Sequence, residues 1–146
     1  MKQTWAVSIF TGLYMLAALI ASIIMGSKEF MLYLAVAPIL GVGVGLLHKK
    51  IELPIPMLWA LSLLGLVHCL GGLITVPENW DTDGKPFLYN LWIIHEKLKF
   101  DQVVHAYGNG IATWLCWNLL RHSISVVVKT DIKDIPARPI FLIICF

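Results

Sequence analysis

Charged residues are scarce in this 146-residue chain, because Asp, Glu, Lys and Arg together make up only 14% of it. A soluble domain usually has about one quarter of its residues charged and about half of them apolar, whereas 58% of this chain is hydrophobic. The composition therefore favours an integral membrane protein that contacts the lipid bilayer. The net charge is only +2 and there is no basic run, so we expect no nucleic-acid partner.

Cysteine is also rare and shows no metal-binding or disulfide pattern. The three cysteines, Cys69, Cys116 and Cys145, lie in separate apolar stretches without a CxxC pair. We expect them to be reduced and buried, since a free cysteine behaves as a small hydrophobic residue. A G-x-S-x-G motif is absent as well, which leaves a serine nucleophile unsupported.

Four long apolar runs predict membrane-spanning helices. The first covers residues 5–25, whose 21 residues would reach about 31 Å at 1.5 Å per residue, enough to cross the hydrocarbon core. The others cover residues 30–47, 57–74 and 100–120, and residues 139–146 begin one more apolar run. We therefore expect an all-α, polytopic transmembrane helical bundle with four spanning helices plus the start of a fifth. It would form a single integral membrane domain over residues 1–146, truncated at its C-terminus.

The segments between and within these helices suggest how the bundle is arranged. Residues 87–99 mix apolar and charged side chains, which predicts an amphipathic helix lying in the membrane interface. Gly41 and Gly45 have the GxxxG spacing that lets helices approach closely, so they predict a helix partner or a homo-oligomer.

The basic residues predict an orientation. Seven Lys and Arg residues fall on the side of the N-terminus, and four fall on the other side. The positive-inside rule therefore places the N-terminus in the cytoplasm.

A polar stripe lies inside the fourth apolar run. Asp101, His105 and Asn109 recur every four residues, which predicts one polar face on a helix. Ionisable groups within a membrane segment are costly and mark a functional site by default. His68 lies in the outer half of the third run at nearly the depth of His105, so we expect His68, Asp101 and His105 to share one pocket that opens outward.

These residue types suit more than one chemistry. Two histidines and a carboxylate could hold a divalent metal such as zinc, with His68, Asp101 and His105 as the ligands. The same residues with Asn109 could bind a ligand or relay a proton. Alternatively, Asp101 caps its helix, His105 forms a hydrogen bond with Asp101 or Asn109, and His68 forms one with a carbonyl across the helix interface.

Two classes of function stay open at this point. One is an integral membrane protein that binds or moves a small solute, a lipid or a proton through a polar site in the outer half of the membrane. The other is a membrane-embedded, metal-dependent hydrolase that activates water against a lipid-like substrate.

Two sequence segments resemble a known family. Residues 66–72 (LVHCLGG) and 100–108 (FDQVVHAYG) resemble the paired His-x-x-Gly-Gly and Tyr/Phe-Asp-x-x-x-His motifs of the YjdF-type prokaryotic inner-membrane proteins. This resemblance implies a bacterial or archaeal plasma membrane and further helices with an acidic motif. The chain is more loosely similar to VanZ-like proteins, whose D-K-x-x-H-x-x-x-Y motif is matched at Asp101 and His105 but not at Gln102 or Asn109.

Overall fold

A row of long helices forms the frame of the molecule. The structure, a computed structural model, describes residues 2–26 and 28–135. Within them, four helices are long and apolar enough to cross a membrane. They are α1 (Lys2–Met25), α2 (Lys28–Ile51), α3 (Ile55–Leu73) and α4 (Phe100–Val128). The expectation of an all-α helical bundle is confirmed, whereas the predicted start of a fifth helix at residues 139–146 lies outside the described residues.

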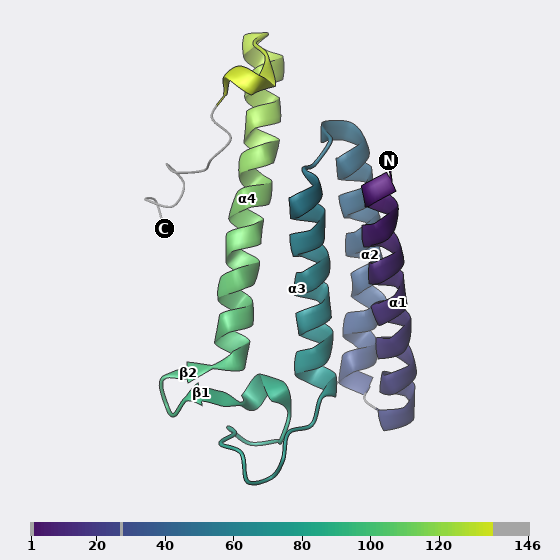
Figure 1. The fold of residues 1–146 in the computed structure, drawn as a ribbon, viewed down its shortest axis with the longest axis vertical. Coiled ribbons are helices and arrows are strands. Elements are labelled where there is room, and N and C mark those ends of the chain that lie inside the picture. The colour runs from purple at the N-terminus through teal and green to yellow at the C-terminus, as the bar shows by residue number, and fades with distance from the viewer. Residues whose placement is uncertain (1, 27, 136–146) are drawn as a thin grey trace.

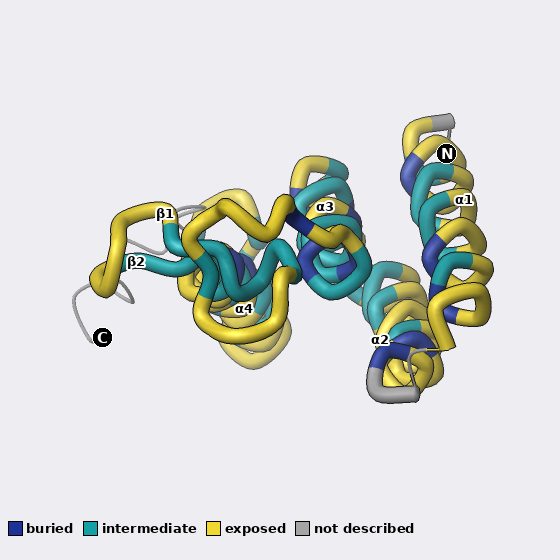
Figure 2. The backbone as a smooth tube through the Cα atoms, turned by 90° about the horizontal axis from the view of Figure 1, so that it is seen from below, coloured by how far each residue is buried: buried dark blue, intermediate teal, exposed yellow. Residues whose placement is uncertain are grey.

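α3 is the central helix. It runs parallel to α1 on one side and antiparallel to α4 on the other (Figure 1). α2 runs antiparallel to α1 and connects the end of α1 to the start of α3 (Figure 1). Seen from below, the buried residues lie where the helices face each other, and most outward surfaces are exposed (Figure 2). Exposed apolar surface on this scale suits a lipid environment, because a soluble monomer rarely carries it.

Two clusters of buried side chains hold α3 in place. Met57 and Leu58 pack with Val7 of α1 and with Leu53 just before α3. Near the other end, Cys69 packs in a second cluster with Ala18, Phe30 and Leu34. Small and aliphatic side chains dominate both clusters, as close van der Waals packing between membrane helices requires.

Hydrogen bonds add a polar link between α1 and α3. The Thr11 and Ser62 hydroxyl oxygens are 2.7 Å apart, and the Tyr14 hydroxyl donates to the Ser62 carbonyl at 2.9 Å. An ideal Cβ on Gly65 would lie 2.5 Å from the Tyr14 hydroxyl, so this glycine leaves room for the ring. Hydroxyl bonds of this kind fix the register of neighbouring helices where no water competes.

The helix boundaries differ from the sequence expectation mainly in α4. This helix continues past the expected end at Leu120 to Val128, where Lys129 adopts a left-handed conformation with φ of 55°. Glycine and proline, which most often end helices, are absent between residues 121 and 128. At about 43 Å, α4 is longer than the hydrocarbon core, and its end projects beyond the other helices (Figure 1).

The prediction of an amphipathic helix over residues 87–99 was wrong. A 3₁₀ turn, Leu88–Asn90, leads into a small antiparallel hairpin of β1 (Trp92–Ile94) and β2 (Leu98–Lys99). Trp92, Ile93 and Ile94 are aromatic or β-branched, which favours a strand, and Glu96 takes a left-handed turn with φ of 52°. The mixture of apolar and charged residues had suggested a helix, but it equally suits a short hairpin.

Residues 74–99 therefore form a folded cap over one end of the bundle. The bridge Thr75↔Phe87 closes its first half and the bridge Thr82↔Leu91 ties that half to the hairpin. Lys99 forms an ion pair with Asp83 and lies 4.7 Å from the centre of the Trp92 ring. The cap joins α3 to α4, so it fixes how the ends of these two helices meet.

The expectation for the cysteines holds only in part. Cys69 is buried and free, as expected, but Cys116 is free and exposed on α4. Cys116 lies on an outward surface of α4. In a membrane, lipid rather than protein would surround this surface, so an apolar residue there does not have to be buried in the bundle. Cys145 lies outside the described residues.

Candidate functional site

The candidate site lies where α3 and α4 meet under the cap. His68 is near the end of α3, and Asp101 and His105 are in the first two turns of α4. The ring centres of His68 and His105 are 6.2 Å apart, with the rings nearly perpendicular. Nε2 of His105 lies 3.3 Å from Oδ1 of Asp101. The structure thus brings three of the four proposed residues into one polar cluster.

Asn109, the fourth residue, lies outside this cluster. It is exposed, and its backbone carbonyl accepts a hydrogen bond from the Thr113 hydroxyl. Four residues of an α-helix turn about 40° more than one full turn. The stripe therefore winds away from α3, and the side-chain exposure rises from 41% at Asp101 to 65% at His105.

The start of α4 is capped by Gln102 rather than by Asp101. The Gln102 side-chain oxygen accepts the backbone N–H of Lys99 at 2.9 Å. Asp101 still lies in the first turn, where a carboxylate favours the helix dipole. Its contact with His105 leaves it in the cluster and not only at the helix start.

Tyr89 completes the cluster from the cap. Its ring lies 5.5 Å from the His68 ring in an edge-to-face arrangement, and 6.5 Å from the Phe100 ring. Burial, followed by the nearby Asp101 carboxylate, raises the pKa of Tyr89 above its usual value. The phenol therefore stays protonated at neutral pH and can donate a hydrogen bond.

The pair Gly71-Gly72 makes room for two aromatic rings. An ideal Cβ on Gly71 would lie 2.6 Å from Cε1 of Tyr89, and one on Gly72 would lie 2.5 Å from Cε2 of Phe30. Both distances are too short for any side chain, so glycine lets the cap and α2 pack on α3. The sequence did not identify Tyr89 as a partner of this pair, because Tyr89 lies in the segment predicted as an amphipathic helix.

Two polar atoms of the cluster are buried without a hydrogen-bond partner. They are Nδ1 of His68 and the hydroxyl oxygen of Tyr89. Buried side-chain polar atoms in native proteins are bonded in the large majority of cases, and leaving one unbonded costs about 1–3 kcal/mol. Both rings therefore carry a hydrogen-bonding atom that no described residue bonds.

The described residues do not form a metal centre. Zinc would need ligand nitrogens within about 2.0–2.1 Å of one ion. Across residues 2–26 and 28–135, no group of three or more His, Cys, Asp or Glu side chains could hold a metal ion. His68, Asp101 and His105 thus lie near each other without the geometry of a ligand set.

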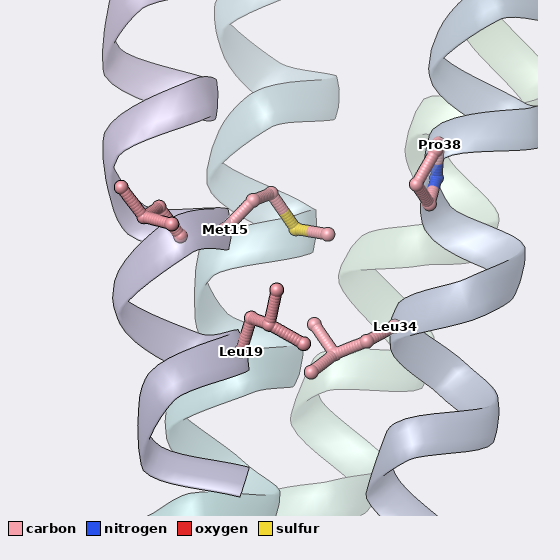
Figure 3. A pocket seen from close by; sticks show the side chains of 5 residues that line it. Met15, Leu19, Leu34 and Pro38 are labelled. Atoms are coloured by element: carbon pink, nitrogen blue, oxygen red, sulfur yellow. The ribbon is translucent and has the colours of Figure 1, made fainter. Parts of the chain in front are cut away.

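Two hollows of similar size lie elsewhere in the molecule. One, of about 280 Å³, lies between α1 and α2 and is lined by Met15, Leu16, Leu19, Leu34 and Pro38 (Figure 3). These side chains are all apolar, so in a bilayer this hollow suits a lipid acyl chain rather than a polar ligand. The other, also about 280 Å³, is at the end of the bundle opposite the cap.

No protein-family model, curated protein or solved structure matches this chain.

Proposed function

We propose that this integral membrane protein binds a small hydrogen-bonding ligand at the capped end of the bundle. The observation that carries this proposal is the pair of unbonded buried atoms, Nδ1 of His68 and the Tyr89 hydroxyl oxygen. A ligand with its own donor and acceptor groups would bond both atoms and offset their burial cost. Asp101 and His105 flank them and can bind a polar or protonated part of the same ligand.

The open flank of α4 supplies a route to this site. His105 and Asp101 are partly exposed, whereas Tyr89 and His68 are half-buried beneath the cap. A ligand would reach Asp101 and His105 first and then the inner pair. The outer part of the proposed site is thus formed by Asp101 and His105, and its inner part by Tyr89 and His68.

The hydrolase hypothesis and its zinc ion stay predictions without geometric support. A metal that activates water needs several ligands and an open coordination position. The described residues offer no such group. Ligand binding requires only the hydrogen-bonding atoms already in place, so the geometry favours it.

The ligand proposal predicts how small polar probes change thermal stability. We expect at least one of ammonium and glycerol to raise the melting temperature of the detergent-purified protein, since a ligand that binds only the folded state stabilises it. The shift should fall in Tyr89→Phe and His68→Leu and persist in His122→Leu, which changes a histidine at the opposite end. Equal shifts of the melting temperature in the unmodified protein and all three variants, or no shift with any probe, would contradict the proposal.

We further propose that the capped end faces outward and that the N-terminus lies in the cytoplasm of a bacterium or archaeon. The start of α1, the α2–α3 connection and the end of α4 share one end of the bundle (Figure 1). Of the ten Lys and Arg residues in the described part of the chain, six lie at this end, and the positive-inside rule favours it as the cytoplasmic end.

This orientation predicts an asymmetric labelling pattern. In a background without Cys69, Cys116 and Cys145, an impermeant thiol reagent added to intact cells should label Glu78→Cys in the cap. It should label Lys49→Cys only after the membrane is opened. Labelling of Lys49→Cys alone in intact cells would reverse the orientation.

Two further proposals rest on sequence motifs. Membership of the YjdF-type family is supported by the paired segments around His68 and His105, which are neighbours in space.

A helix partner at Gly41 and Gly45 is supported by the open space at both glycines, where an ideal Cβ has nothing within 4 Å. Small residues on an uncovered membrane helix let a second helix approach closely.

A further inference from the structure

The second hollow, lined by both polar and apolar side chains, lies at the end of the bundle opposite the cap. It is lined by Lys50, at the end of α2, and by His122, Ser123, Val126 and Val127 of α4. Its volume of about 280 Å³ has room for a phosphate group together with its glycerol carbons. The hollow is well separated from the His68 cluster, which lies at the start of α4.

The basic groups at this hollow have no acidic partner. His48, Lys49 and Lys50 form the last turn of α2. In the part of the chain that the structure describes, every ion pair involves the cap or the start of α4. The nearest carboxylate in sequence, Glu52, is exposed and forms no ion pair with Lys50 among these residues. The positive charge of Lys50 is therefore free to bind an anion.

The depth of the hollow corresponds to the level of lipid headgroups. The apolar window of α2 ends at Ile51, so Lys50 lies where that helix leaves the hydrocarbon core. Basic pockets between membrane helices bind anionic headgroups in this position, and each basic residue adds to the attraction. A bilayer also delivers headgroups to this level at a concentration that no free anion reaches.

We propose that this hollow binds the phosphate headgroup of an anionic phospholipid. Lys50 supplies the charge, and the His122 ring can donate a hydrogen bond to a phosphate oxygen, whereas the Ser123 hydroxyl donates to the Leu119 carbonyl at 3.0 Å. Val126 and Val127 give the hollow an apolar wall. Such a wall suits the glycerol carbons of a lipid, whereas it adds nothing for inorganic phosphate.

The test counts lipids retained by the full chain in native mass spectrometry. The protein, purified in detergent, is mixed with equal amounts of phosphatidylglycerol and phosphatidylcholine. We expect preferential retention of phosphatidylglycerol, and a drop in this preference of about fivefold in Lys50→Gln, as expected for one basic residue at a membrane surface. Lys85→Gln, which changes an exposed lysine in the cap, is the matched control and should leave the preference unchanged.

The remaining outcomes would overturn the proposal. An equal loss in Lys50→Gln and Lys85→Gln would indicate attraction by net charge and not by this hollow. Equal retention of the two lipids by the unmodified protein would exclude a headgroup preference. Displacement of phosphatidylglycerol by millimolar inorganic phosphate would indicate a free-anion site and contradict the lipid assignment.

Discussion

Replacing Gly71 by valine is expected to detach the cap from α3. The Tyr89 ring occupies the space that any Cβ at Gly71 would need, with three ring atoms 2.6–2.8 Å from it. Valine adds two more carbon atoms at this point, and overpacking of this kind costs about 1–3 kcal/mol of folding free energy. The cap then has to move away, because α3 itself is held by its two buried clusters.

The measurement combines stability with access to the cap. Thermal unfolding in detergent should show a lower midpoint for Gly71→Val, and trypsin should cleave faster after Lys97. Gly12→Val is the control, because it makes the same substitution inside a spanning helix, α1, where nothing lies within 4 Å of an ideal Cβ. If both variants unfold and are cleaved like the unmodified protein, the cap does not pack on Gly71.

The sequence predicted the four spanning helices well because a long apolar run marks each of them. An uncharged run that matches the thickness of a bilayer has few alternatives to a spanning helix. The boundaries were less certain, since α4 continues to Val128 through residues that tolerate helix as well as loop. Helix ends are decided by local contacts, such as the bond from the Thr130 N–H to the Ser125 carbonyl, that no periodicity reveals.

The cap could not be predicted in the same way. Its backbone bonds join residues far apart in sequence, for example from the Trp92 N–H to the Asp81 carbonyl and from the Leu88 N–H to the Ile74 carbonyl. Helix periodicity reveals contacts between residues three or four positions apart, and it does not reveal these long-range backbone hydrogen bonds. For this reason Tyr89 was not recognised as part of the candidate site.

The polar stripe shows how far spacing alone can be trusted. Depth correctly suggested that His68 and His105 lie at one level, and their rings are neighbours. Asn109 was grouped with them because it continues the spacing of four residues. The extra turn of about 40° per step carries it off the shared face. A stripe with alternating steps of three and four residues would have stayed on that face.

The central claim is that His68 and His105 share one site beneath the cap, and a pairwise cross-link tests it most directly. In a background without the native cysteines, His68→Cys/His105→Cys is treated in membranes with a short, permeant, bifunctional thiol reagent. Trypsin then cuts the cap after Lys97, between the two positions. We predict that the fragments stay joined in this pair, since the native rings are 6.2 Å apart. They should separate in His68→Cys/Asn109→Cys, where α4 has turned away. Equal joining in both pairs, or joining only in the Asn109 pair, would contradict a site shared by His68 and His105.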